Sequence, residues 1–359
     1  MIKIMSNKTY SNPGYWYAIL SAVLFGAATP AAKFLLDKIH PLLLAGLLYL
    51  GSAVGLFIIF FFQRYLTKSA TKEASLRSSD LPWLSSAVLL GGIIGPVLLM
   101  VGLMRLPAAS ASLLLNLESV FTAVIAWFAF KEHVDRNIAL GMMSIVIGSF
   151  MLSWKGSLTY QSLSGPSLIA GACLCWAIDN NLTRKISAAN PLQIAMIKSL
   201  IAGLTNITIA MVFGAILPSS VFIISAGIVG FLGYGVSLLL FILGLRHIGT
   251  ARTGAYFALA PFVGAGFAII FLNEPVSVQL LLASLFMGIG IWLHLSEHHS
   301  HAHQHEAIEH EHRHTHDEHH QHEHQPTDPP GEPHTHWHQH KPLYHTHPHF
   351  PDIHHRHKH

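Results

Sequence analysis

The chain reads GLMRLPAASASLLLNLESVFTAVIAWFAFKEHV at residues 102–134 and GLRHIGTARTGAYFALAPFVGAGFAIIFLNEPV at residues 244–276. The two stretches align without a gap, and Glu132 falls opposite Glu274, two residues before a Val that both stretches share. Apolar sequences match easily by chance, so the position of the match matters more than its extent. Each stretch covers the third and fourth apolar runs of its half of the chain, which indicates an internal duplication.

The composition places this duplication in a membrane. Hydrophobic residues make up 51% of the chain and charged residues only 11%, about half the charged share of a soluble domain. A helix needs about 20 apolar residues to cross a bilayer core. Ten runs of this kind are present, at residues 16–36, 41–62, 82–104, 106–130, 136–154, 165–186, 190–216, 220–245, 248–272 and 275–296.

The duplication divides these runs into two halves, residues 16–154 and 165–296. Pro41 and Pro191 open the second run of each half. Because five is an odd number, the second half crosses the membrane in the opposite sense to the first. The sequence therefore predicts an all-α integral membrane protein with ten transmembrane helices in two inverted five-helix repeats, an architecture found in many secondary transporters. A duplicated membrane protein that does not transport is the alternative.

The distribution of Lys and Arg predicts the orientation. With a cytoplasmic N-terminal segment (residues 1–15), twelve of the Lys and Arg residues in or near the loops lie on the inner side and four on the outer side. Cytoplasmic loops carry such an excess. We expect an integral protein of the plasma (cell inner) membrane with both termini in the cytoplasm. A cleaved signal around Ile19 is the alternative, because GAATPAA follows that run.

The chain resembles the EamA-type members of the drug/metabolite transporter superfamily. The resemblance rests on LNLESVFTAVIAWFAFKE (115–132), WAIDNNLTRK (176–185) and the paired run ends FKEHV and LNEPV, and it covers about residues 16–296. It implies export or exchange of small metabolites through a central cavity lined chiefly by helices 1, 3, 4, 6, 8 and 9, without naming a substrate. The chain departs from the family at Ser119, where helix 4 usually carries a Pro, as Pro261 does in the second half.

Three charged residues lie deep within the apolar runs: Glu118, Asp179 and Lys198. A charge at mid-bilayer costs roughly 2.5–3.5 kcal/mol on insertion scales, so such residues face a cavity or a partner. An ion pair between Asp179 and Lys198 across a helical hairpin is the structural explanation for two of them. Glu118 is the first candidate for a proton-coupling or substrate-ammonium site. A protonated Glu118 bonded to a neighbouring helix backbone is its alternative.

Neighbouring polar residues extend this candidate site. Asp179, Asn180 and Asn181 are 100° apart on a helix and cannot all face one partner, so we expect at least one of the two amides to contact substrate. Together they suit a molecule with ammonium or hydroxyl donors and carbonyl acceptors. The candidate substrate and cavity residues are Asn116, Glu118, Trp176, Asp179, Asn180, Asn181, Lys198, Arg252 and Tyr256.

The C-terminal segment, residues 297–359, is of a different character. It holds 24 of the 28 histidines, together with many Pro, Glu and Gln, so it lacks the apolar residues for a core and is expected to be disordered. Imidazole is a leading ligand of Zn, Ni and Cu, which predicts loose binding of divalent metal ions. A pH-responsive charged tail is the alternative. The predicted ligands are His298, His299, His301, His303, His305, His310, His312, His314, His316, His319, His320, His322 and His324.

These observations favour a secondary-active transporter that exports a small polar, amino-acid-like metabolite by alternating access, with proton coupling as an open question. A divalent metal transporter, or a non-transporting metal store or sensor acting through the tail, is the alternative. The expected partners are the lipid bilayer, a small-molecule substrate and metal ions at the tail, with no required cofactor. No motif for hydrolysis, phosphate binding or nucleic acid is present, so an enzyme is not expected.

Overall fold

The computed structural model describes residues 13–66, 76–130, 136–154, 160–186 and 190–295, together with four strands in the C-terminal segment. The first half of the chain contains α1 (Pro13–Leu36), α2 (Pro41–Leu66), the 3-10 turn η1 (Ser78–Asp80), α3 (Leu81–Ala87), the π-helix η2 (Val88–Ile94), α4 (Gly95–Leu103), α5 (Ala108–Leu114), α6 (Leu117–Phe130) and α7 (Arg136–Ser153). The second half contains α8 (Tyr160–Ile186), α9 (Pro191–Val212), α10 (Ser220–Gly230), the π-helix η3 (Phe231–Val236), α11 (Ser237–Phe257), α12 (Ala260–Phe271) and α13 (Val278–Leu295). Glu132 and His133 lie outside the described residues.

Most of these helices are suited to a bilayer. Within the described part of the chain, seven helical stretches are long and apolar enough to span a membrane: Pro13–Leu36, Pro41–Phe62, Ser78–Leu103, Ala108–Ile125, Arg136–Ser153, Leu192–Val212 and Ser220–Gly244. Ala260–Phe271 and Val278–Leu293 are apolar but shorter. The helix α8 is 27 residues long and carries the polar run Asp179–Asn181, which makes it less apolar than its neighbours.

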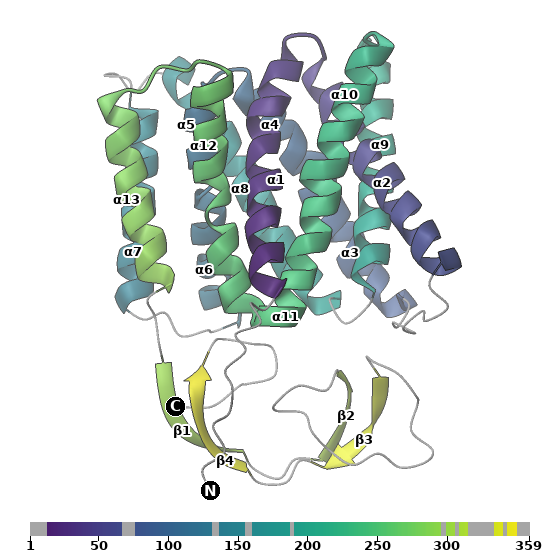
Figure 1. The fold of residues 1–359 in the computed structure, drawn as a ribbon, viewed down its shortest axis with the longest axis vertical. Helices are drawn as coiled ribbons and strands as arrows, with labels where there is room; N and C mark the ends of the chain where they lie inside the picture. The colour runs from purple at the N-terminus through teal and green to yellow at the C-terminus, as the bar shows by residue number, and fades with distance from the viewer. Residues whose placement is uncertain are drawn as a thin grey trace, which may run out of the picture.

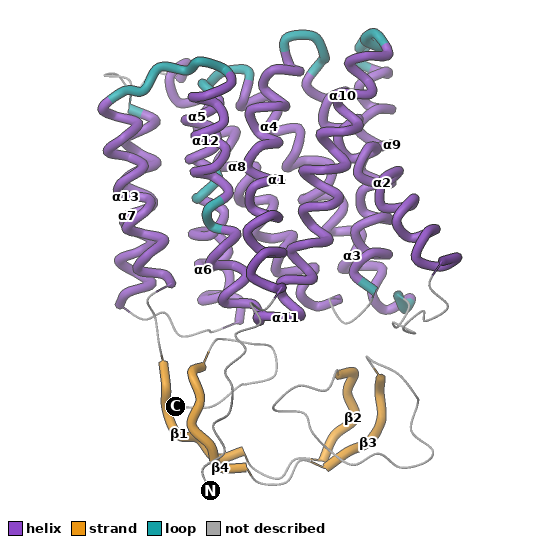
Figure 2. The backbone as a smooth tube through the Cα atoms, viewed as in Figure 1, coloured by secondary structure: helices purple, strands orange, loops and turns teal. Residues whose placement is uncertain are grey.

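The helices form one bundle in which the two halves interlock. In the first half, α1 packs along α11 and α12 of the second half, and α8 of the second half packs along α4 and α6 of the first. The helices α2 and α9 pair with each other, as do α7 and α13. Figure 2 shows the helices running side by side, with described loops at the end of the bundle away from the strands. The bundle therefore depends on both halves.

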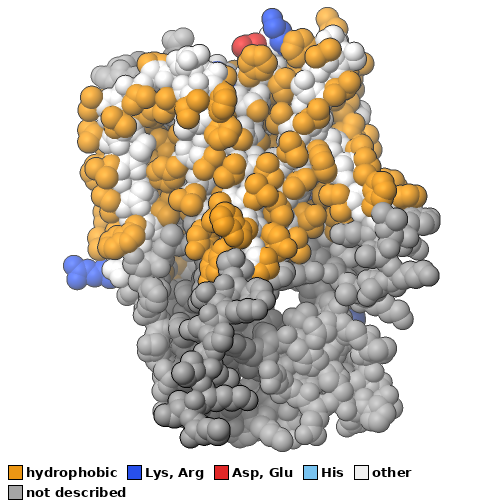
Figure 3. All heavy atoms as spheres, viewed as in Figure 1, with side chains coloured by type: hydrophobic (Ala, Val, Ile, Leu, Met, Phe, Trp, Pro, Cys, Tyr) orange, Lys and Arg blue, Asp and Glu red, His pale blue; other side chains and the backbone are white. Residues whose placement is uncertain are grey.

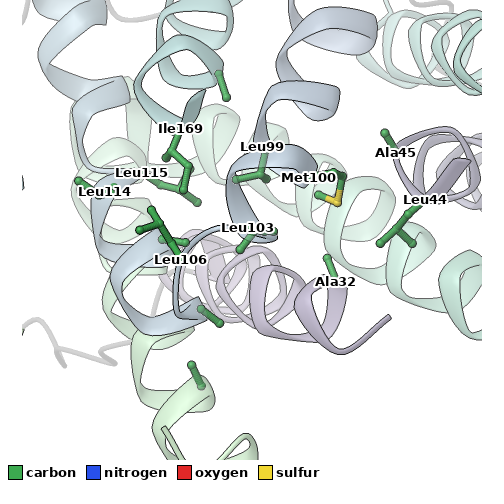
Figure 4. Packing of buried hydrophobic residues seen from close by; sticks show 14 of the residues in the cluster. Ala32, Leu44, Ala45, Leu99, Met100, Leu103, Leu106, Leu114, Leu115 and Ile169 are labelled. Atoms are coloured by element: carbon green, nitrogen blue, oxygen red, sulfur yellow. The ribbon is translucent and has the colours of Figure 1, made fainter. Parts of the chain in front are cut away.

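The core lies where α1, α2, α4, α5 and α8 meet. Figure 4 shows Leu99, Met100 and Leu103 of α4 between Ala32 of α1 and Leu44 of α2 on one side and Ile169 of α8 on the other. Hydrophobic side chains also cover the outside of the helices on the face drawn in Figure 3, and charged ones lie at its edges. An apolar outer surface of this extent is expected of a protein that faces lipid.

Two π-helical segments occupy matching places in the halves. Glu132 and Glu274 of the aligned stretches are 142 residues apart (274 − 132). The same offset carries η2 (Val88–Ile94) onto residues 230–236 (88 + 142, 94 + 142), and η3 spans Phe231–Val236. A π turn shifts the hydrogen-bonding pattern and leaves carbonyl groups in need of other donors. Both halves thus have the same local deformation in their third apolar run.

The fourth apolar run is also interrupted in both halves. The helix breaks for one turn at Leu115–Asn116, between α5 and α6, and again at Ala258–Leu259, between α11 and α12. Pro261 lies in the first turn of α12, whereas α6 has Ser119 at the matching place. The break in the first half therefore forms without the Pro that the second half carries.

One predicted boundary is wrong. The sequence predicts separate runs at 220–245 and 248–272, but α11 continues as one helix from Ser237 to Phe257. In the first half, Pro107 separates α4 from α5, because a Pro lacks the N–H that would continue a helix. The matching residue in the second half is Gly249 (107 + 142), which has that N–H and allows the helix to continue.

The C-terminal segment differs from the prediction of a disordered tail. The structure contains β1 (His299–His305) paired antiparallel with β4 (Leu343–His349), and β2 (Glu309–His314) paired antiparallel with β3 (His334–Gln339). Figure 1 shows both pairs beyond the end of the bundle where α13 ends. The alternation of His with other residues suits an extended backbone, in which successive side chains point to opposite faces.

Candidate functional site

Asp179 of α8 and Lys198 of α9 form an ion pair in the interior. Lys198 Nζ donates to Asp179 Oδ2, and Thr183 Oγ1 donates to Asp179 Oδ1 at 3.0 Å. The side chains of Asp179 and Lys198 are only 5% and 15% exposed. Both carboxylate oxygens are therefore satisfied by protein groups, as a buried charge requires.

The helix α9, which carries Lys198, has a defined start. Asn190 caps α9, its Oδ1 accepting from the backbone N–H of Leu192 at 2.9 Å and of Gln193 at 3.3 Å. Pro191 follows in the first turn, where a missing N–H costs nothing. This cap fixes where α9 begins and so the height at which Lys198 meets α8.

The π-helix η2 supplies a backbone acceptor beside the ion pair. The carbonyl oxygen of Gly91 accepts from Tyr49 Oη at 2.9 Å and from Trp176 Nε1 at 3.0 Å. The carbonyl of Gly92 accepts from Asn206 Nδ2 at 3.2 Å. Side chains from α2, α8 and α9 thus bind two carbonyls of the π-helix, which holds η2 in place.

Gly91 also makes room for the ion pair. A Cβ atom at Gly91 would overlap the carboxylate of Asp179. The absence of a side chain is therefore what allows the Asp179 carboxylate to reach η2 and still meet Lys198.

Glu118 and Asn180 form a second polar contact, of a different kind. Asn180 Nδ2 donates to Glu118 Oε1 at 2.7 Å. Glu118, in the first turn of α6, is half-buried, and Asn180 is exposed. Asn180 lies six residues before the end of α8, about 9 Å along the helix axis. An exposed amide and a half-buried carboxylate at that depth are strongly disfavoured in hydrocarbon, so we expect the pair to face water.

The side-chain amides of Asn181 and Asn116 are hydrogen-bonded to backbone carbonyls. Asn181 Nδ2 donates to Ala177 O of its own helix at 2.8 Å, and its side chain is buried. Asn116 Nδ2 donates to Leu113 O at 3.0 Å and approaches Met287 Sδ at 3.7 Å. The prediction that one amide of α8 contacts substrate therefore rests on Asn180.

The remaining predicted residues lie elsewhere. Trp176 is buried and bound to η2. Tyr256 of α11 packs edge-on against Tyr15 of α1, with ring centroids 5.7 Å apart. The side chain of Arg252 lies outside the described residues.

Sequence reasoning missed Tyr49, Asn206 and Cys173. Cys173 Sγ lies 3.7 and 3.8 Å from the carbonyls of Leu114 and Leu115, at the break between α5 and α6. Each of these residues places a polar or thiol group inside an apolar run. Because such groups need a partner in a membrane, this pattern could have identified them.

The histidine side chains of the tail lie outside the described residues, so the structure places no predicted metal ligand there. Within the described part of the chain, no group of three or more His, Cys, Asp or Glu side chains is arranged to hold a metal ion.

Residues 12–154 and 163–296 each match the model of the EamA-like transporter family. The chain belongs to the EamA-like transporter family. The resemblance found in the sequence is confirmed, and the protein is an integral membrane transporter rather than an enzyme.

The EamA-like chain has similar relatives in archaea and bacteria. An uncharacterized transporter of Methanothermobacter thermautotrophicus is 28% identical over 295 residues, which covers 78% of this chain and 85% of that protein. A probable amino-acid metabolite efflux pump of Salmonella typhimurium is 26% identical over 298 residues, covering 77% and 93%. A solved crystal structure shares the fold with a TM-score of 0.58 at 16% identity, covering 79% of this chain and 95% of the other.

Proposed function

We propose that this EamA-like transporter exports a small polar, amino-acid-like metabolite by alternating access, coupled to protons, with Glu118 and Asn180 in the substrate site. The observation that supports this most is the 2.7 Å contact between the two side chains, with Asn180 exposed at membrane depth. The similar Salmonella typhimurium protein, a probable amino-acid metabolite efflux pump, points to the same class of substrate.

Alternating access here rests on ten membrane passes in two inverted repeats, residues 16–154 and 165–296. Three observations support this architecture: the family model matches each half separately, η2 and η3 occupy matching places, and the packing of α1 on α11 and α12 mirrors that of α8 on α4 and α6. Inverted repeats place a substrate site near the midplane, at the interface between the repeats.

The chemistry of the Glu118–Asn180 pair suits an ammonium group. An ionised carboxylate accepts hydrogen bonds from an ammonium, and an amide oxygen adds a further acceptor. When Glu118 takes up a proton, it loses the charge that attracts the ammonium and becomes a donor. A proton taken up from one side of the membrane then releases substrate to that same side. Substrate and protons therefore cross the membrane in opposite directions, and the two movements are coupled.

The chain offers a matched control for testing the site. Asn180 and Asn181 are adjacent on α8, but Asn180 contacts Glu118 and Asn181 is bonded to its own helix. We expect Asn180→Ala to lower the rate of amino-acid export from loaded vesicles at least about tenfold, equivalent to ~1.4 kcal/mol. Asn181→Ala should stay within about twofold. Equal loss in both variants would refute the assignment.

Proton coupling has its own test. Glu118→Gln keeps the shape of the side chain and an acceptor oxygen for Asn180, but it does not titrate. We expect export by this variant to be slow and insensitive to an imposed pH gradient. Export that still follows the gradient as in the unmodified protein would eliminate Glu118 as the proton site.

The tail is proposed as a separate metal-binding segment in the cytoplasm. Its support is composition: 24 histidines in residues 297–359, the neutral imidazole being a strong ligand for Zn, Ni and Cu. Removing residues 297–359 should abolish most Zn binding, measured by calorimetry on the purified full chain and the truncated one. Loss of metal tolerance in cells that carry the truncated chain, with Glu118 and Asp179 intact, would favour a metal-centred function instead.

A further inference from the structure

Glu274, the residue aligned with Glu132 in the sequence duplication, makes a contact between the halves. Its Oε1 accepts from the backbone N–H of Ala108 at 2.6 Å and its Oε2 from that of Ala109 at 2.8 Å. Both donors are at the start of α5 in the first half, and Glu274 lies between α12 and α13 in the second. Hydrogen bonds from backbone N–H groups to a carboxylate are among the stronger ones in proteins.

The local sequence aims Glu274 at this target. Asn273 follows the end of α12 with a φ of 53°, and the Glu274 N–H lies 3.5 Å from Ala268 O. This is the left-handed turn that commonly ends helices, and Asn is one of the residues that accept it. Pro275 comes next and prevents the helix from continuing. The turn reverses the chain, so the carboxylate points back to α5.

Beneath this contact, α1, α5 and α12 pack without room for side chains. A Cβ atom at Gly264 of α12 would lie 2.8 Å from Gly26 O of α1 and 2.8 Å from Ser112 Oγ of α5. Ser112 is four residues after Ala108, about 6 Å along α5. At this end of the bundle, α5 is thus joined to the second half at the rim by Glu274 and below it by this three-helix contact.

The buried hydroxyl group of Ser112 makes this close packing less stable. Ser112 is only 1% exposed, and its Oγ has no hydrogen-bond partner within the described part of the chain. A buried polar group without a partner destabilises the state that buries it. Opening between α5 and α12 would hydrate this hydroxyl, so the closed state depends more on the contact at the rim.

We propose that Glu274 is a latch that closes the transport pathway between α5 and α12, at the end of the bundle away from the tail strands. Glu274 acts as a positioning residue: its carboxylate holds the start of α5, and breaking its two hydrogen bonds lets α5 and α12 separate. The proposal rests on the alternating-access function above. In the structure, the latch is closed while Asn180 is exposed nearer the other end of the bundle, which is the combination required of a site open to one side only.

Labelling of a cysteine beneath the latch tests this. Ser112→Cys is introduced into the full chain in membrane vesicles, right-side-out and inverted, and a membrane-impermeant maleimide is added. The chain without this change gives the background from Cys173 and Cys175. Glu274→Ala should raise the rate of labelling at position 112 about tenfold in one vesicle type, and Glu274→Gln, which keeps one acceptor oxygen, should raise it less. Asp37→Ala, which removes a carboxylate just after α1 at the same end, should leave the rate unchanged.

A second introduced thiol separates opening from unfolding. Ala283 is fully buried on α13, and labelling of Ala283→Cys should stay low in the Glu274 variants. Equal labelling at position 112 with Glu, Gln and Ala at position 274 would overturn the latch, as would a rise at both introduced thiols. Export is measured in parallel. If the unmodified protein exports no amino acid, the proposed function is overturned while the labelling pattern still supports the latch. If export is normal but labelling is equal, the latch alone is overturned.

Discussion

Removing one charge of the Asp179–Lys198 pair should destabilise the protein, whereas removing both should not. Lys198→Met leaves the Asp179 carboxylate buried with only the Thr183 hydroxyl as a side-chain donor, and Asp179→Asn leaves the Lys198 ammonium without its counter-charge. Asp179 is buried and the Lys198 side chain is only 15% exposed, so the effect of losing one partner should approach the roughly 3–5 kcal/mol typical of buried pairs. We expect each single variant to lose stability of this size.

The double variant, Asp179→Asn with Lys198→Met, should recover most of that loss. Replacing a buried ion pair by neutral groups of similar volume is often neutral or stabilising. We therefore expect it to unfold within about 1.5 kcal/mol of the unmodified protein, measured by thermal or denaturant unfolding in detergent. Export should recover with it, because the proposed substrate site consists of Glu118 and Asn180.

Two results would refute this reasoning. Single variants that lose less than about 1 kcal/mol would mean that the pair is solvated as a surface pair is. A double variant that regains stability but not export would mean that the charges take part in transport, and the assignment to Glu118 and Asn180 alone would be wrong.

Three further predictions concern the packing around the site and the tail. Gly91→Ala should destabilise by about 1–3 kcal/mol in thermal unfolding, because the added methyl overlaps the Asp179 carboxylate; Gly254→Ala, with nothing within 4 Å of the added methyl, should not destabilise. Trp176→Phe should cost about 0.5–1.5 kcal/mol for one lost hydrogen bond, and a larger loss would indicate a role beyond holding η2. Removing residues 297–359 should leave export in metal-free medium unchanged. A lower transport rate for the truncated chain than for the full chain would contradict this prediction.

The family and the duplication could be predicted from the sequence because both depend on residue order alone. The aligned stretches ending in FKEHV and LNEPV, with LNLESVFTAVIAWFAFKE and WAIDNNLTRK, carried the resemblance, and the family model matches both halves. The sequence also identified Asp179 and Lys198 as potential partners, since their distances from the ends of α8 and α9 put them at similar depth. The structure brings these two side chains together.

Other features depend on packing that the sequence does not encode locally. The sequence places Asn180 and Asn181 100° apart, but the rotation of α8 against α4 and α6 decides which of them faces Glu118. The π turn at η2 depends on donors from three other helices, which no pattern within residues 88–94 reveals. The helix boundary predicted after residue 245 failed for a similar reason, because nothing in the chain there forces a break.

The acceptors of η2 have a mechanical consequence. Tyr49, Trp176 and Asn206 bind the carbonyls of Gly91 and Gly92 from three different helices. Moving α8 relative to α2 or α9 would require breaking one of these bonds, and all three donor side chains are buried. We therefore expect α2, η2, α8 and α9 to travel as one rigid body during the transport cycle, so that motion is concentrated along the seam where α5 meets α12.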